Sequence, residues 1–222
     1  MKRLIQRMSI MILSLMILVQ ATAAIALEAG FRVTAAPVVQ ASPTTVVEGI
    51  PNPDALFKPS LIDLQMTGIP LRLPTYIPKV GQRLSDPKAK KEILPPYGHL
   101  DQATANKYQV TIGYTPTCEG GNVCRLGTIS ATRITKGTPS IQEQYASRKD
   151  PNFQGKRSKE VMSDIQLANG IPGTFVPWVC GASCTDAEVV WDEAGYRYSV
   201  GIKVGDRASL IEMANSAIQK KS

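Results

Sequence analysis

Apolar and polar residues alternate along three stretches of the chain. Residues 108–114, 187–191 and 196–202 place an apolar side chain at every second position. A period of two predicts strands that bury one face. Residues 192–195 separate the last two stretches, and Gly195 can adopt the positive φ that follows a type I turn. These residues together predict a β-hairpin.

Two more hairpins are expected from β-branched residues and turn signals. Residues 126–134 are rich in β-branched side chains and should pair back on the strand before them. Residues 161–168 and 174–179 are predicted strands on either side of Asn169-Gly170-Ile171-Pro172-Gly173, a sequence typical of a turn.

The end of the chain predicts a helix. Asp206 is a good N-cap, and the apolar residues after it recur on one helix face: Leu210, Met213, Ala214, Ala217 and Ile218. Residues 140–149 predict a second, shorter helix. Antiparallel strands with a C-terminal amphipathic helix indicate an α+β fold, a twisted antiparallel sheet of hairpins with one or more helices packed on one face.

The N-terminus resembles an export segment. Lys2, Arg3 and Arg7 precede an apolar run over residues 8–26, which predicts either a signal peptide cleaved after Ala26 or an uncleaved membrane anchor. Both alternatives leave the positive charges inside and place the rest of the chain outside the cytoplasm. We therefore expect a periplasmic or secreted protein, or one anchored to the inner membrane through residues 8–26.

Prolines mark the next two segments. Residues 27–63 contain five prolines and no sustained period, which predicts an extended linker. Pro70, Pro74 and Pro78 then exclude a helix interior from residues 69–78. We expect a single folded domain over residues 64–222.

The four cysteines form two close pairs, Cys118 with Cys124 and Cys180 with Cys184. Four cysteines allow three connectivities, and the short spacings favour one local disulfide in each pair, which suits an oxidising compartment. Zinc binding and thiol redox chemistry are the alternatives. The first pair is wider than the two to four residues that zinc pairs prefer, and the second is wider than a redox motif.

Composition narrows the class of protein. The chain has 222 residues, of which 43% are hydrophobic and 19% charged, values typical of one globular domain. The net charge is +7, but three positive charges precede the apolar run, so the remainder carries 22 minus 18, or +4. This excess is too small and too scattered to indicate nucleic-acid binding.

The sequence contains no recognisable catalytic, cofactor or metal motif. The single histidine, His99, stands beside Gly98 in a predicted loop. No serine has the Gly-x-Ser-x-Gly pattern, and no phosphate-binding glycine motif or zinc-protease helix motif occurs. Asp186 and Glu188 share one strand face, which we interpret as a solvated polar face rather than a catalytic carboxylate pair.

Two surface features bear on partners. Basic residues gather over 88–91 and 148–159, which suits either solvated loops or contact with anionic lipid or a cell-wall polymer. Trp191, Tyr196 and Tyr198 alternate on predicted strands, a pattern more typical of a core than of a sugar-stacking platform.

Both ends of the predicted domain carry short motifs of a known family. These are Leu73-Pro74-Thr75-Tyr76-Ile77-Pro78, Val190-Trp191, Gly195-Tyr196-Arg197-Tyr198, and residues 210–216. The chain resembles an extracytoplasmic domain of unknown function found on anti-sigma factors and related bacterial envelope proteins, itself loosely similar to lipoprotein-carrier folds. The two cysteine loops depart from that family. The resemblance implies a fold rather than an activity.

Two function classes follow from these observations. The first is an exported, non-enzymatic envelope protein that binds a lipid, a cell-wall polymer or a protein partner. The alternative is an exported, hydrolase-like enzyme whose site is not recognisable from sequence. A deep apolar cavity under the sheet would favour lipid binding, whereas a polar cleft that gathers His99 with carboxylates would favour the enzyme.

Overall fold

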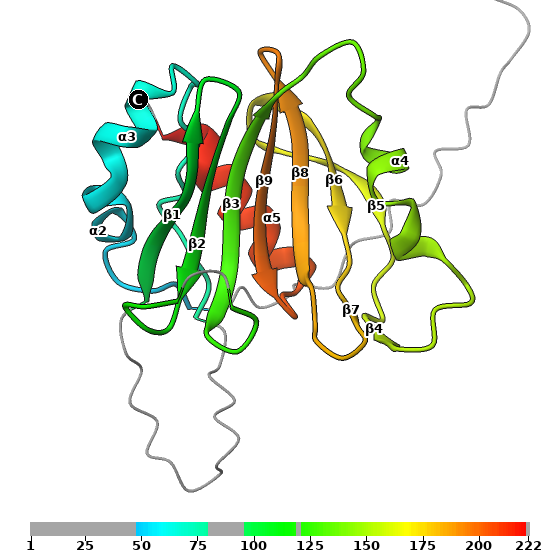
Figure 1. Ribbon diagram of the computed structural model, residues 1–222. Coiled ribbons are helices and arrows are strands. Elements are labelled where there is room, and N and C mark those ends of the chain that lie inside the picture. Colours follow the sequence, from blue (N-terminus) through cyan, green and yellow to red (C-terminus); the bar gives the residue numbers. More distant parts are fainter. Residues whose placement is uncertain (1–47, 80–95, 119–120, 221–222) are drawn as a thin grey trace, which may run out of the picture. The chain divides into compact units, whose positions relative to one another are not determined.

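The computed structural model describes residues 48–79, 96–118 and 121–220 (Figure 1). The chain divides into two compact units, 1–43 and 44–222, and every described residue belongs to the second. The predicted signal or anchor segment therefore lies outside the described residues.

A seven-stranded antiparallel sheet forms the centre of the described part, in the order β1-β2-β3-β9-β8-β6-β5 (Figure 1). Its strands are β1 (Tyr97–Thr104), β2 (Lys107–Gly113), β3 (Arg125–Arg133), β5 (Ser163–Gln166), β6 (Pro172–Val176), β8 (Asp186–Glu193) and β9 (Tyr196–Lys203). A small second sheet pairs β4 (Lys156–Arg157) with β7 (Val179–Cys180). The short helix η3 (Ala168–Gly170) connects β5 to β6. The predicted α+β class is confirmed.

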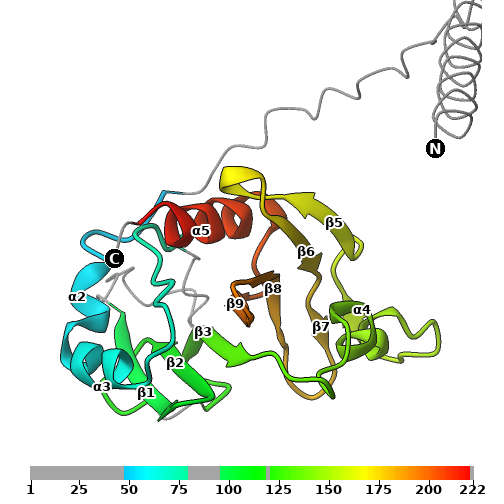
Figure 2. The same ribbon diagram turned by 90° about the horizontal axis from the view of Figure 1, so that it is seen from above.

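The C-terminal helix α5 (Arg207–Gln219) lies across one face of the sheet, next to β8 and β9 (Figure 2). The side chain of Asp206 caps it by accepting a hydrogen bond from the Ser209 N–H at 2.9 Å. The five apolar residues expected to share one face of this helix are all buried. Burial of that face holds α5 on the sheet.

The apolar core lies between α5 and the sheet. Trp191 of β8 is completely buried and stacks on Tyr198 of β9, with 5.4 Å between the ring centroids. Tyr196 is half-buried beside the Arg133 guanidinium, which lies 5.0 Å from its ring centroid. The interpretation of Trp191 and Tyr198 as core residues is confirmed.

The prediction of an extended linker over 27–63 is wrong for its last part. Residues 54–66 form α2 (Asp54–Phe57), the short helix η1 (Lys58–Ser60) and α3 (Leu61–Met66). Pro53 is the N-cap of α2 and Pro59 is at the start of η1, positions where the missing N–H leaves no hydrogen bond unmade. Leu56, Phe57 and Leu64 join the core, so the domain begins before residue 64.

The proline segment 69–78 crosses the core as an extended strap, as its prolines predict. The Tyr198 hydroxyl donates to the Pro70 carbonyl at 3.0 Å. Arg72 forms two hydrogen bonds with the Glu193 carboxylate, at 2.9 and 2.5 Å. The Ser216 hydroxyl of α5 accepts from the backbone N–H of Thr75 and of Tyr76. The strap thereby joins the β8–β9 hairpin to α5.

The interpretation of His99 as a loop residue is also wrong, because β1 spans 97–104. This strand has little alternation, and a bulge between Leu100 and Gln102 shifts its register. Gly98 lets α2 approach closely: a Cβ atom there would lie 2.3 Å from the Leu56 carbonyl oxygen. The His99 Nε2 lies 3.2 Å from the Thr115 carbonyl oxygen.

Candidate functional site

A polar cleft of about 470 Å³ lies on the face of the sheet opposite α5. Its floor comes from β3, β9 and β8, whose alternate side chains point away from the core. The floor residues are Ser130, Thr132, Arg197, Ser199, Glu188 and Val190. In Figure 1, α5 lies behind the strands, so the face of the sheet that carries these floor residues is turned toward the viewer.

The roof of the cleft is the connection from β3 to α4 (Ile141–Gln144) and the residue that follows α4. The roof residues are Thr135, Gly137, Thr138, Pro139, Gln144 and Tyr145. Ser140 caps α4 in a capping box, in which its hydroxyl accepts from the Glu143 N–H and the Glu143 carboxylate accepts from the Ser140 N–H at 2.8 Å. The short helix predicted over 140–149 therefore consists of α4 and the following η2 (Ala146–Lys149).

Arg197 fastens the roof to the floor. Its guanidinium forms two hydrogen bonds with the Asp192 carboxylate, at 2.8 and 2.9 Å, and donates to the Pro139 carbonyl and the Gln144 side chain. The hydrogen bonds with Asp192 raise the pKa of Arg197 above its ordinary value. Beside it, the hydroxyls of Ser130 and Ser199 lie 2.8 Å apart across β3 and β9. Arg197 therefore neutralises Asp192, and the hydroxyls remain as the small polar groups of the floor.

Glu188 is the acidic group of the cleft. The Tyr145 hydroxyl donates to its carboxylate at 2.7 Å, and Arg148 Nη2 lies 3.5 Å from its other oxygen. Burial raises the pKa of Glu188, although Tyr145 and Arg148 act against that shift. Burial also raises the pKa of Tyr145, so its phenol stays a hydrogen-bond donor.

Asp186 forms a second buried ion pair at the N-terminal end of β8. Arg125 Nη2 lies 3.1 Å from its carboxylate, and the Thr128 hydroxyl donates to the other oxygen. The interpretation of Asp186 and Glu188 as a solvated polar face is therefore wrong. Arg125 and Arg148 cover these carboxylates from elements far away in the sequence, which alternation along one strand cannot reveal.

Glu188 should make stability depend on pH. A pKa that is raised in the folded state means that the native protein holds this proton more tightly than the unfolded chain does. This contribution is therefore lost as the pH rises from the ordinary value of 4.5 through the folded pKa. Glu188→Gln cannot titrate, so its free energy of unfolding should improve relative to wild type as the pH rises, measured by urea unfolding at several pH values. A difference that stays constant with pH would contradict this assignment.

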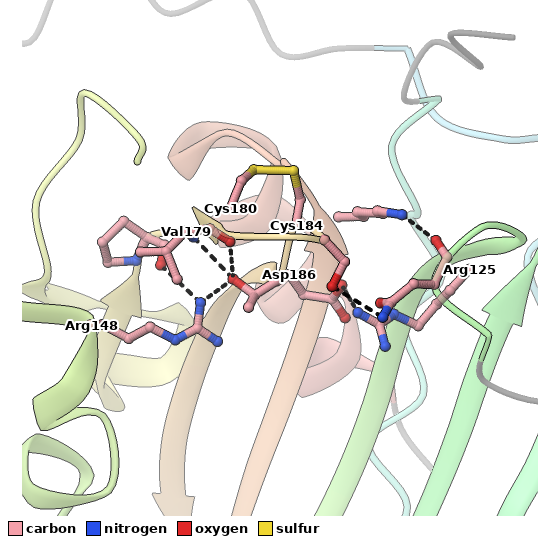
Figure 3. Close-up of a disulfide and its surroundings, with 11 residues drawn as sticks. Arg125, Arg148, Val179, Cys180, Cys184 and Asp186 are labelled. Atoms are coloured by element: carbon pink, nitrogen blue, oxygen red, sulfur yellow. Dashed lines mark hydrogen bonds and ion pairs between the residues drawn. A yellow bond between two sulfur atoms is a disulfide. The ribbon is translucent and has the colours of Figure 1, made fainter. Parts of the chain in front are cut away.

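Both predicted disulfides are present, Cys118–Cys124 and Cys180–Cys184, with S–S distances of 2.05 and 2.02 Å. Their loops touch, because the Asn122 side-chain amide donates to the Ser183 hydroxyl at 3.2 Å. Figure 3 shows the second disulfide with Arg148 on one side and the Arg125–Asp186 pair on the other. The two bonds indicate an oxidising, extracytoplasmic environment.

The other candidates from the sequence lie outside the cleft. His99 is on β1 and does not line it. Lys156, Arg157 and Lys159 are exposed, and Arg157 lies over the Phe153 ring at 5.4 Å. The basic residues at 88–91 are outside the described residues. Over 48–79, 96–118 and 121–220, no group of three or more His, Cys, Asp or Glu is arranged to hold a metal ion. Within those same ranges, no helix is long and apolar enough to cross a membrane.

Sequence reasoning missed the roof and the pairing of Glu188 with Tyr145. The spacing Ser140-x-x-Glu143 is a capping-box signal that could have placed the start of α4. Comparison with protein-family models, curated proteins and solved structures found no match for this chain. The geometry of the cleft therefore carries the functional argument.

Proposed function

We propose that this chain is an exported, non-enzymatic envelope protein that binds a cell-wall glycan in the polar cleft. The observation that carries the proposal is the set of polar side chains that line the cleft. Serine and threonine hydroxyls and the Gln144 amide provide groups that both donate and accept hydrogen bonds. A sugar presents hydroxyl and amide groups of the same two-way kind. The Tyr145 ring adds an amphipathic surface against which a sugar ring can pack.

The distribution of apolar groups favours a glycan over a lipid. An acyl chain needs an open apolar cavity, but the apolar face of the sheet is covered by α5. Leu210, Met213 and Trp191 are completely buried there. The open side of the sheet carries hydroxyls and ion pairs instead. The exposed basic residues Lys156 and Arg157 of β4, with Lys159 after them, form a separate surface that could meet anionic groups of the same polymer.

The state of the carboxylates favours binding over catalysis. A hydrolase needs a carboxyl group free to donate a proton or to attack its substrate. Glu188 lines the cleft, but Tyr145 and Arg148 engage its two oxygens. Asp186 is engaged by Arg125 and Thr128. The alternative, an exported enzyme, would have to use Glu188 after displacing both of its partners.

The proposal includes the compartment. Residues 1–26 would export the chain, as a cleaved signal peptide or as an anchor through residues 8–26. The two disulfides support a place outside the cytoplasm. The resemblance of the strap, the tryptophan hairpin and the last helix to the extracytoplasmic domain of anti-sigma factors supports the same compartment.

Binding of soluble peptidoglycan fragments tests the proposal. The Ser199 side chain lies on the cleft floor and not in the core, so Ser199→Phe should fill the cleft while a strand keeps a residue that strands favour. We expect calorimetric titration to show binding by wild type and a loss of affinity of at least about tenfold in Ser199→Phe, since a filled site loses several hydrogen bonds. Circular dichroism should show an unchanged fold.

His99→Ala is the matched control, because His99 lies on the same sheet but outside the cleft. It should bind like wild type. Wild-type protein that binds no fragment, or Ser199→Phe that binds equally well, would reject the glycan proposal. Cleavage of the fragments by wild type but not by Glu188→Gln would replace it with the enzyme alternative.

A further inference from the structure

The hydroxyl of Thr185 uses all of its hydrogen-bonding capacity at the base of the second disulfide loop. It donates to the Val179 carbonyl at 3.1 Å, accepts from the Val179 N–H at 3.0 Å, and accepts from Arg148 Nη1. A hydroxyl has one donor and two acceptor positions, and all three are occupied here. Val179 and Thr185 form the neck of this loop. Thr185 therefore joins the neck to the Arg148 side chain of η2.

The disulfide closes the loop directly above that neck. Cys180 and Cys184 follow Val179 and precede Thr185, and they face each other as an antiparallel bridge. The Thr185 N–H also donates to the Val179 carbonyl, at 2.9 Å. Figure 3 shows Arg148 reaching toward this neck, below the bond between Cys180 and Cys184. The crosslink thus holds together the two backbone segments on which the Thr185 hydroxyl depends.

Arg148 links Thr185 to Glu188, which lines the cleft. Its guanidinium reaches Thr185 with one nitrogen and Glu188 with another, and its side chain is 14% exposed. Its backbone N–H donates to the Tyr145 carbonyl at 2.9 Å, so both residues belong to one turn. The Tyr145 hydroxyl and Arg148 then bind opposite oxygens of one carboxylate. A fixed guanidinium therefore fixes the Tyr145 ring in the roof.

We infer that Arg148 is a positioning residue for the cleft, and that the Cys180–Cys184 loop holds Arg148 through the Thr185 hydroxyl. The loop would thus set the position of Tyr145, although neither cysteine lines the cleft. The inference rests on the proposed function only for the identity of what the cleft binds. Arg148 uses two separate nitrogens for these two acceptors, an arrangement that the single nitrogen of a lysine does not reproduce.

Hydrogen–deuterium exchange of residues 141–149 tests the inference without any ligand. The measurement uses the purified protein with both disulfides formed. Thr185→Val removes the hydroxyl but keeps the shape of the side chain. It should speed exchange in this segment at least about tenfold, because Arg148 loses its charged hydrogen bond to Thr185 and Val179 loses its two hydrogen bonds to the same hydroxyl. Thr185→Ser keeps the hydroxyl and should exchange like wild type. In the NMR spectrum, the Tyr145 ring signals, assigned with Tyr145→Phe, should shift in Thr185→Val and not in Thr185→Ser.

The disulfides provide the second comparison. Joint replacement of Cys180 and Cys184 by alanine should speed exchange of residues 141–149 in the same way. Joint replacement of Cys118 and Cys124 should not, since the three hydrogen bonds of the Thr185 hydroxyl go to Val179 and Arg148. Unchanged exchange in Thr185→Val, or equal changes in Thr185→Ser, would overturn the inference. Failure of wild type to bind glycan rejects only the proposed function, because neither exchange nor NMR depends on a ligand.

Discussion

Trp191→Ala should lower the free energy of unfolding by about 3 to 5 kcal/mol, the usual cost of removing a large buried aromatic side chain. Trp191 is completely buried between the sheet and α5, and it stacks on Tyr198. Its indole N–H also lies 3.4 Å from the Glu193 carboxylate, which Arg72 of the strap binds. The loss would be a large share of the roughly 5 to 15 kcal/mol that stabilises a typical domain.

Urea unfolding followed by circular dichroism measures this loss. Ile62→Ala is the control, because Ile62 is 72% exposed on α3 and its truncation should change stability by less than about 0.5 kcal/mol. A loss of less than about 1 kcal/mol in Trp191→Ala would contradict the packing of the core around this residue.

The strands in which apolar and polar residues alternate are the strands that bury one complete face against the core. In β8, Ala187, Val189 and Trp191 all face the core, so burial requires an apolar residue at every second position. The alternate residues of β2, Tyr108 and Val110 among them, face the core in the same way. The α+β class followed from this pattern, because the hydrophobic effect acts locally on each strand and leaves its period in the sequence.

The elements that sequence reasoning missed lack such a period. In β1 the bulge after Leu100 breaks the alternation, and polar residues such as Asp101 and Gln102 occupy the strand. In residues 54–66, Pro53 and Pro59 suggested a linker, yet both lie where a helix tolerates proline. A proline count cannot distinguish the start of a helix from an extended chain.

The cleft depends on contacts between distant parts of the sequence. Tyr145 and Glu188 are 43 residues apart, and Arg125 and Asp186 are 61 residues apart. Local spacing identified both disulfides, because the cysteines of each pair are close neighbours in the chain. It could not identify the partners of the two carboxylates, since only the folded chain brings β3 and η2 next to the first residues of β8.

Asp186→Ala should lower the free energy of unfolding by about 3 kcal/mol, because removal of one partner leaves the other charge of a buried ion pair uncompensated. The side chain of Asp186 is 6% exposed and that of Arg125 is 20% exposed. Arg125 Nε is already buried without a hydrogen-bond partner among the described residues, so the guanidinium depends on Asp186. The Thr128 hydroxyl would lose its acceptor as well.

An exposed ion pair supplies the comparison. Lys79 and Glu48 lie 2.6 Å apart, but the side chain of Glu48 is 80% exposed, so Glu48→Ala should cost less than about 1 kcal/mol. Replacement of Arg125 by methionine together with Asp186 by leucine should recover most of the loss in Asp186→Ala, because the pair would then leave no charge buried. Urea unfolding of the three variants measures these differences. Equal costs for Asp186→Ala and Glu48→Ala would mean that water reaches Arg125 freely, and the start of β8 would then carry an open charged surface rather than a buried ion pair.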